Sequence, residues 1–231
     1  TYLALLLIWD IPYYIFPVIA LLCNIIVVSG NSFNYIRAGN HNFKLLLPFL
    51  IGSVPLAFFG GTLKIDKDIF EILLFFVLCI AGILLLINNK SYENNNLIIK
   101  KLNFFLSLFI GSVLGLVSGI VGIGGGIFLS PILFLLKSEK PKIIVTTASL
   151  FILINSISGI LGQLTKENIL TELSNYIPLF ICVFIGGLLG NYLNLKIFSS
   201  RVLAIITSLL VIFVSIRMGI RIFINYIWLI L

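Results

Sequence analysis

Glycine is concentrated in one stretch of the chain, residues 117–131, which is otherwise apolar. Glycine loses more backbone freedom than any other residue when a helix forms. The run Gly124-Gly125-Gly126 in this stretch therefore predicts a helix break. Just after the run, Ser130 is a suitable N-cap and Pro131 a suitable first helical residue, which predicts a short helix ending near Leu136. The candidate site comprises the break and its cap: Gly122, Gly124, Gly125, Gly126 and Ser130.

The chemistry that such a break offers is anion binding through the backbone. The N–H groups at a helix N-terminus, together with those of adjacent glycines, form a concave spot of positive potential. At membrane depth, irregular backbone is tolerated only where protein or a water-filled cavity covers it, so we expect the break to line a substrate pathway. Asn155 and Ser158 are expected to support the substrate from a later segment, with Asn24 and Ser29 as their nearest counterparts in the first half.

The centres of the apolar segments contain no Asp, Glu, Lys, Arg or His. They therefore lack the usual groups for acid–base or metal chemistry. The single histidine, His41, lies in a polar loop without a carboxylate or cysteine nearby in sequence. Cys23, Cys79 and Cys182 lack metal-ligand spacing and are expected to be inert packing residues. This pattern argues against a carboxylate-centred pump and against a membrane enzyme acting on lipids, and it predicts neither a metal nor a cofactor.

The elements that must position these residues are membrane-spanning helices. Of the 231 residues, 60% are hydrophobic and 10% are charged, and the mean hydropathy is +1.21. Average soluble domains carry about 25% charged residues. Long apolar runs recur without the period of two that is typical of an outer-membrane barrel. The predicted fold class is therefore all-α, a polytopic helical membrane protein.

Seven complete spans are expected, and the glycine break with its short helix follows the fourth of them. They cover residues 13–35, 43–63, 69–87, 104–121, 143–164, 176–195 and 202–224. The net charge of +7 comes from Lys and Arg residues scattered through the connections, which indicates membrane edges rather than a nucleic-acid surface. If the break adds no crossing, these cations divide about evenly between the two faces, and the positive-inside rule leaves the orientation open.

The two halves of the chain are expected to be repeats, residues 1–101 and residues 102–231. A shift of 129 positions places Thr1 on Ser130, Pro12 on Pro141, and Ser29-Gly30 on Ser158-Gly159. Residues 2–9 are too short to span a membrane alone, so we expect the first repeat to be truncated and a second glycine-rich break to lie upstream of Thr1. Duplicated halves with broken helices at matching places are the usual sequence sign of a transporter site near the midplane.

Other glycines have spacings that predict helix packing. Gly111, Gly115 and Gly119 recur every four residues, which allows two helix backbones to approach closely. Close packing is also the favoured role for the late glycines of two other spans, which are Gly60, Gly61, Gly186, Gly187 and Gly190. Polar amides such as Gln163, Asn191 and Asn194 are expected to hydrogen-bond neighbouring helices.

The segment from Gly115 to Leu136 resembles the hallmark of the TauE/SafE family of sulfite-exporter-like permeases, in which a glycine-rich break precedes a short helix with an early proline. The match is carried by residues 122–126 and Pro131, with further similarity at residues 37–44, 148–149, 158–159, 178 and 186–190. The resemblance implies a multi-pass permease of the bacterial cytoplasmic membrane. It also implies a small organic or inorganic anion as substrate, often a sulfur-containing one.

Together these observations predict a membrane permease that moves a small anion, sulfite-like or sulfonate-like, across the cytoplasmic membrane. The expected partners are this anion and the lipid bilayer, without nucleic acid. A non-transporting membrane scaffold or assembly factor is the alternative, because glycine packing motifs alone would serve it. The sequence leaves open which anion moves, its direction, the coupling ion and the oligomeric state.

Overall fold

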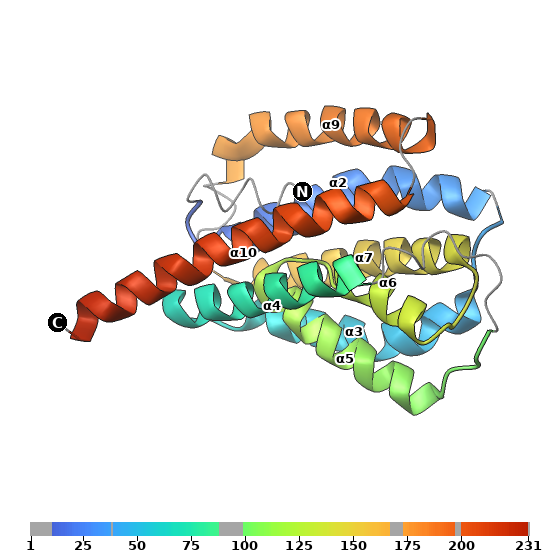
Figure 1. The fold of residues 1–231 in the computed structure, drawn as a ribbon, viewed down its shortest axis with the longest axis horizontal. Coiled ribbons are helices and arrows are strands. Elements are labelled where there is room, and N and C mark those ends of the chain that lie inside the picture. The colour runs from blue at the N-terminus through green and yellow to red at the C-terminus, as the bar shows by residue number, and fades with distance from the viewer. Residues whose placement is uncertain (1–10, 38, 88–98, 167–172, 197–199, 231) are drawn as a thin grey trace.

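The computed structural model describes residues 11–37, 39–87, 99–166, 173–196 and 200–230. Within these ranges the chain is helical and no strand is present, as Figure 1 shows. The elements are α2 (Phe16–Arg37), α3 (Phe43–Thr62), α4 (Lys67–Ile87), α5 (Phe104–Val121), α6 (Gly126–Leu135), α7 (Pro141–Gln163), the 3-10 turn η2 (Ser174–Tyr176), α9 (Ile177–Lys196) and α10 (Ser200–Ile230). The predicted all-α class is confirmed.

Six helices are long and apolar enough to cross a membrane: α2, α3, α4, α5, α7 and the part of α10 from Ile205 to Ile224. The remaining expected span, residues 176–195, coincides with α9, where the apolar helical segment Ser174–Gly190 is shorter than these six. Residues 2–9 and most of the polar connection 88–103 lie outside the described residues.

Large apolar side chains face outward along these helices. Phe105 is 77% exposed, Phe109 66% and Phe213 62%. In water such surfaces would drive aggregation, whereas hydrocarbon solvates them. The interior is also apolar, with Phe16, Phe49 and Phe151 among the largest fully buried side chains. The distribution of apolar side chains agrees with a multi-pass membrane protein.

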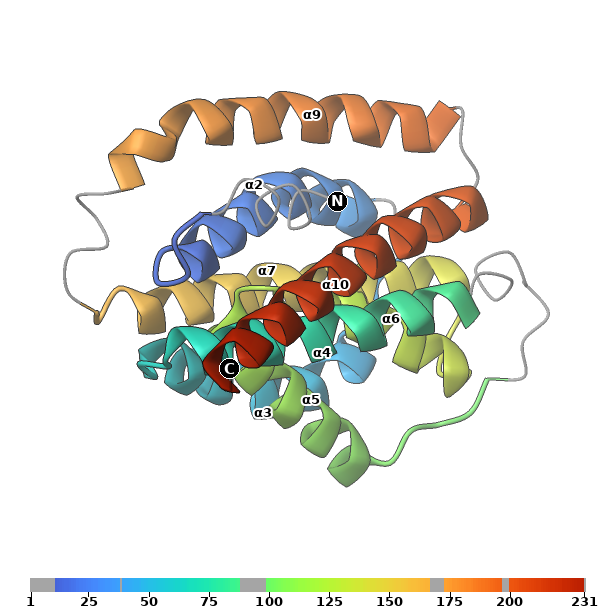
Figure 2. The same cartoon turned by 60° about the vertical axis from the view of Figure 1, so that its left-hand side comes forward.

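The helices form a layered bundle in which neighbours are far apart in sequence. Figure 2 shows α9 outside α2, then α7, and then α3 with α5, while α10 lies along α4. In Figure 1, α2, α4 and α9 run in one direction, and α3, α5, α7 and α10 run in the other. The α3, α5 and α7 helices are thus parallel neighbours, and α2 is antiparallel to α7.

Glycines hold α3 and α5 in close contact. A Cβ on Gly115 would lie 2.5 Å from Cα of Ser53, and a Cβ on Gly111 or Gly119 would collide with the backbone of Phe49 or Ala57. The packing role predicted for these three α5 glycines is confirmed. We call this contact, together with the neighbouring contact of Gly61 with Gly159 on α7, the glycine seam.

The late glycines of the two other spans differ from one another. Gly60 and Gly61 pack against α5 and α7 backbones as predicted. Gly187 makes an ordinary contact with Val27, but a Cβ on Gly186 or Gly190 would meet no described atom within 4 Å. The prediction of close packing is therefore wrong for Gly186 and Gly190 with respect to the described residues.

The α5 and α6 helices form a hairpin rather than one broken crossing. After residues 122–125, α6 turns back along α7, and the backbone N–H of Lys100 donates to the carbonyl of Lys137 at 2.9 Å. Residues before α5 and residues after α6 therefore lie on the same face of the bundle, which we call the hairpin face (Figure 1). The predicted span from Phe104 to about Val121 is confirmed, since it coincides with α5, and the positive-φ glycines after it reverse the chain direction.

The predicted cap at Ser130 is also wrong. The α6 helix begins at Gly126 with Gly125 as its N-cap, so Ser130 and Pro131 lie inside the helix. Local capping rules favour serine before proline, but the left-handed Gly125 starts the helix five residues earlier. The predicted end of the helix near Leu136 is confirmed, since Leu136 is its C-cap.

Candidate functional site

The break between α5 and α6 depends on glycines with a left-handed backbone. Gly122 terminates α5 with φ of +83°, and Gly124 and Gly125 follow with φ of +76° and +72°. Residues with a Cβ adopt such angles at a cost of about 1–2 kcal/mol each. The amide of Gly122 donates to the carbonyl of Ser118 at 2.8 Å, which closes α5. The sequence therefore produces a sharp reversal that few other residues permit.

The backbone N–H groups of residues 123–127 have no backbone acceptor among the described residues. Regular bonding resumes at Phe128 and Leu129, whose N–H groups donate to the carbonyl of Gly125 at 3.2 Å. Residues 123–126 are buried. Leaving a buried donor without a partner costs about 1–3 kcal/mol. Such a cluster of free donors at a helix N-terminus favours an anionic ligand.

Side chains of α2 and α7 form the wall opposite Gly124. A Cβ built on Gly124 would lie 2.8 Å from Nδ2 of Asn24, 2.8 Å from Cγ2 of Ile152 and 3.1 Å from Oγ of Ser156. Nδ2 of Asn24 donates to the carbonyl of Gly122 at 3.3 Å. Ser156 is fully buried, and its hydroxyl has no hydrogen-bond partner. A free polar group is thus directed at the break.

The side of the break at Gly125 contacts α5 and another part of α7. A Cβ on Gly125 would lie 2.9 Å from Cε1 of Phe151, 3.3 Å from the carbonyl oxygen of Leu114 and 3.6 Å from Cβ of Ser118. Gly126 packs so closely against Ile152 that a Cβ would collide with its side chain. Every glycine of the break is therefore required both by its surroundings and, at positions 122, 124 and 125, by its backbone angle.

A cavity of about 280 Å³ lies beside this break, next to the start of α2. Phe16 lines the cavity, and the adjacent Pro17 lies against Gly122, where a Cβ would be 2.5 Å from Cα of Pro17. The cavity is on the face opposite the hairpin face, which we call the cavity face. Its lining residues are Ile11, Pro12, Tyr13, Phe16, Lys67, Phe70, Glu71, Leu74, Met218 and Arg221.

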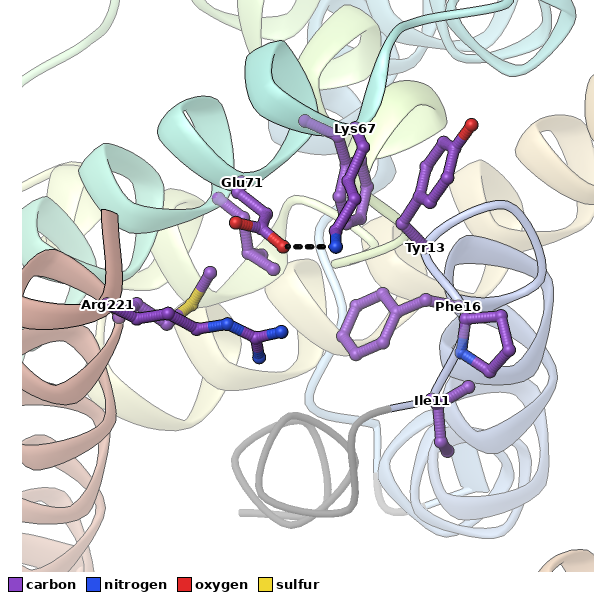
Figure 3. A pocket seen from close by; sticks show the side chains of 10 residues that line it. Ile11, Tyr13, Phe16, Lys67, Glu71 and Arg221 are labelled. Carbon is purple, nitrogen blue, oxygen red and sulfur yellow. Dashed lines mark ion pairs between the residues drawn. The ribbon is translucent and has the colours of Figure 1, made fainter. Parts of the chain in front are cut away.

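Charged side chains meet in the cavity, as Figure 3 shows. Nζ of Lys67 lies 3.9 Å from Oε1 of Glu71, one helical turn along α4. The guanidinium of Arg221 extends from α10 toward the same space (Figure 3). The described lining of the cavity thus contains the side chains of Lys67, Glu71 and Arg221. Sequence reasoning missed this cluster because its members come from separate helices, although the i,i+4 spacing of Lys67 and Glu71 was visible.

Comparison with known proteins identifies the class of molecule. The family described as "Sulfite exporter TauE/SafE" matches residues 1–218. The chain belongs to this family. A relative described as "Probable membrane transporter protein y4hK", from Sinorhizobium fredii (strain NBRC 101917 / NGR234), is 26% identical over 195 residues, which cover 83% of this chain and 77% of that protein. No solved structure gives a significant match. The chain is a multi-pass membrane transporter of the TauE/SafE family.

In this TauE/SafE transporter, the structure brings together some of the predicted site residues. Gly122, Gly124, Gly125 and Gly126 form one buried reversal. Ser130 lies in the second turn of α6, half-buried and outside the break. The substrate-binding role of all of these residues remains a prediction.

The predicted α7 side chains have other hydrogen-bond partners. Nδ2 of Asn155 donates to the carbonyl of Phe151 at 2.9 Å, while its Oδ1 is buried without a partner. Oγ of Ser158 donates to the carbonyl of Val54 on α3 at 2.6 Å, so its proton is used between helices. The α7 residues that face Gly124 are instead Ile152 and Ser156. Their helical spacing was visible, but spacing alone does not show which face of α7 meets the break.

The two predicted counterparts in the first half of the chain, Asn24 and Ser29, lie in different surroundings. Asn24 is buried at the break, whereas Ser29 is exposed and its hydroxyl donates to the carbonyl of Ile26 on its own helix. No group of three or more His, Cys, Asp or Glu side chains with metal-binding geometry is found in the described part of the chain. Cys23, Cys79 and Cys182 are free thiols.

Proposed function

We propose that this transporter moves a small oxyanion, sulfite-like or sulfonate-like, and binds it at the α5–α6 break. The observation that supports the proposal is the run of N–H groups at residues 123–127 that have no backbone acceptor among the described residues, of which residues 123–126 are buried. An anion with several oxygens accepts several of these bonds at once. The family's description as a sulfite exporter favours a sulfur oxyanion among the possible substrates.

The proposed binding mode uses dipoles rather than a fixed charge. Backbone donors at the N-terminus of α6 favour negative charge, and the hydroxyl of Ser156 supplies a further donor. A transporter must also release its substrate, and neutral donors hold an anion less tightly than a buried lysine or arginine would. This mode agrees with the absence of charged side chains from the described surroundings of the break.

The cavity is the proposed entrance to this site. The cavity contains polar side chains that water and a small ion can reach, and Phe16 and Pro17 separate the cavity from Gly122. A small displacement of the start of α2 would connect the cavity with the break. Movement of α2 against α5 is therefore the proposed gating step.

The hairpin returns the chain to the face from which α5 started. The cations of the connections therefore no longer divide evenly, and this difference indicates the orientation of the protein in the membrane. We propose that the hairpin face is cytoplasmic under the positive-inside rule. Among the described residues, the hairpin face carries Arg37, Lys44, Lys100, Lys101, Lys137, Lys140, Lys142 and Arg201 with Glu139. The cavity face carries Lys64, Lys67, Lys166, Arg217 and Arg221 with Asp66, Asp68 and Glu71.

Thiol labelling in intact cells tests the orientation. In a background without the three native cysteines, Lys64→Cys is expected to react with a membrane-impermeant maleimide, and Lys137→Cys is expected to react only after the cells are opened. The reverse pattern would place the hairpin face outside and contradict the proposal.

The two-repeat organisation also remains a proposal, and the packing supports it. Under the predicted shift, α2, α3 and α4 correspond in order to α7, α9 and α10. Helices α2 and α7 pack antiparallel, with Leu21 against Gly159 and Ser32 bonded to Ser149 at 2.9 Å. Helices α4 and α10 also pack antiparallel, with Gly82 against Ile212 and Phe75 against Gly219. Such pairs are expected for inverted repeats around a central axis.

Flux in proteoliposomes tests the proposed site. Gly125→Val places a branched side chain against Phe151 at a φ of +72°, so it is expected to abolish uptake of radiolabelled sulfite while the protein stays folded in the membrane. Gly186→Val is the matched control, because a side chain there meets no described atom within 4 Å. Unchanged sulfite flux in Gly125→Val would remove the site assignment.

The alternative of a non-transporting scaffold predicts a different result. Wild-type protein would then carry no anion of a panel that includes sulfite, sulfonates and small carboxylates, although it reconstitutes fully. Flux of a carboxylate alone would retain the permease and reject the sulfur substrate.

A further inference from the structure

Four buried side-chain oxygens on α3, α5 and α7 have no hydrogen-bond partner among the described residues. Nearly all buried polar side chains in proteins are hydrogen-bonded, so each exception requires an explanation such as an ion or water. All four residues are 0% exposed and lie on α3, α5 and α7: Ser53, Ser118, Asn155 and Ser156. Ser156 faces Gly124, where the anion is proposed to bind. The other three require a separate explanation.

The hydrogen bonding of Asn155 indicates which charge a ligand at this place would carry. Its Nδ2 donates to the carbonyl of Phe151 at 2.9 Å, and an exchange of its amide atoms would place two acceptors against each other. The free atom is therefore Oδ1, which accepts hydrogen bonds or binds cations but repels anions. This atom contradicts a direct role for Asn155 in holding the anion.

The three oxygens lie in one layer of the parallel helices α3, α5 and α7. Ser53 backs onto Gly115 of α5, and the hydroxyl of Ser158 on α7 reaches the carbonyl of Val54, next to Ser53. Ser118 lies one helical turn beyond Leu114 on α5. Leu114, Ser118 and Phe151 all lie close to the place where a Cβ on Gly125 would be.

The amide group of Asn155 bends back toward Phe151, to which it is bonded, and so toward the Gly125 end of this layer. Its Oδ1 is thereby brought to the part of the bundle where Ser118 also lies. The pairing of Ser53 with Gly115 and of Gly159 with Gly119 places Ser53, Ser118 and Asn155 within about one helical turn of one another along the bundle.

We propose that Ser53 Oγ, Ser118 Oγ and Asn155 Oδ1 bind a sodium-sized monovalent cation beside the anion site. Neutral oxygens suit such an ion, whereas divalent ions prefer carboxylates, and none lies here. The C-terminal end of α5 adds partial negative charge. Half-helix C-terminal ends and unwound backbone are the places where transporters coordinate coupling cations.

A cation here would explain how an anion is held at membrane depth without a fixed positive side chain. The cation and the anion would partly neutralise each other, so each raises the affinity of the other by the same factor. This coupling rests on the proposed function, whereas the cation site itself does not. The two claims can therefore be tested separately.

Thermal unfolding of the purified full chain, without any anion substrate, tests the cation site. Sodium chloride is expected to raise the unfolding temperature in a saturable way relative to equal concentrations of choline chloride, with potassium and lithium chloride as comparison arms. Asn155→Leu and Ser118→Ala are each expected to weaken sodium binding at least about tenfold, which corresponds to about 1.4 kcal/mol. Ser208→Ala, a buried hydroxyl on α10 bonded within its own helix, is the matched control.

The outcomes separate the two claims. An equal unfolding temperature in all four chlorides would mean that water fills the site, and would overturn the proposal. If Asn155→Leu does not fold, Ser118→Ala decides alone. A sodium effect that both site variants retain would also overturn the proposal. Sodium binding without sulfite flux would keep the cation site and reject the proposed function. Sulfite flux unaffected by sodium would reject the coupling.

Discussion

The glycine seam and the glycine break are adjacent in sequence but use glycine for opposite purposes. In the seam, Gly111, Gly115 and Gly119 have ordinary helical angles, and backbone of α3 fills the space where their side chains would be. In the break, Gly122, Gly124 and Gly125 have positive φ, and the N–H groups of residues 123–127 have no backbone acceptor among the described residues. The seam therefore stabilises the bundle, and the break leaves polar groups available for a ligand.

The largest expected effect comes from filling the seam. A side chain at Gly115 would overlap Ser53 backbone, which has no rotamer by which to move away, so Gly115→Val is expected to prevent recovery of folded protein. Overpacking costs about 1–3 kcal/mol where neighbours can adjust, and more where they cannot. Size-exclusion chromatography in detergent measures the yield, and Gly186→Val again serves as control. A monodisperse Gly115→Val protein would show that the seam is not required for stability.

A second test compares two serines on α7 that differ in hydrogen bonding. Ser158 donates to Val54 across the seam, so Ser158→Ala is expected to destabilise the fold by about 1 kcal/mol without changing substrate affinity. Ser156 has no partner, so Ser156→Ala is expected to leave stability unchanged or slightly higher. It should instead weaken sulfite affinity about tenfold, as the loss of one hydrogen bond to an anion would.

Thermal unfolding and the KM for sulfite flux, measured on both alanine variants, separate the two roles. The interpretation fails if Ser156→Ala is the destabilised variant and Ser158→Ala the one with weaker sulfite affinity. Equal effects of both substitutions on flux would also contradict the distinction between seam and break.

Sequence reasoning predicted the seam better than the break because the seam depends on local spacing. Glycines every four residues on a helix must share one face, so Gly111, Gly115 and Gly119 could be assigned to packing. The break was also located correctly, since Gly124, Gly125 and Gly126 in a row oppose helix formation. The direction of the chain after the break was not predicted, because it depends on φ angles and on the contact of Gly126 with Ile152.

The remaining errors have the same origin. Ser130 satisfied a local capping rule, yet Gly125 began the helix earlier. Asn155 and Ser158 were chosen because the repeat places them opposite the break, and that argument does not show that Ser156 lies beside Gly124. The cavity joins residues of α2, α4 and α10, a combination that only the tertiary structure produces. Spans and breaks were therefore predictable from composition and spacing, whereas the lining of the site was not.

The smallest expected effect concerns the cavity-face end of the seam, where Lys166 lies just beyond α7. Nζ of Lys166 donates to Oε1 of Gln163 at 2.9 Å, and Nε2 of Gln163 donates to the carbonyl of Gly119 at 2.8 Å. Burial, followed by the charge of nearby Lys64, lowers the pKa of Lys166 from 10.5 to about 8.

Between these two pKa values the unfolded chain binds more protons than the folded one, so stability should rise as the pH increases from about 8 toward 10.5. Lys166→Met is expected to lose this rise, whereas Ser156→Ala at the break should keep it. Unfolding temperatures of the three proteins across this pH range provide the comparison. A rise that persists unchanged in Lys166→Met would assign it to another group, and its loss in Ser156→Ala would mean that the seam and the break do not respond independently.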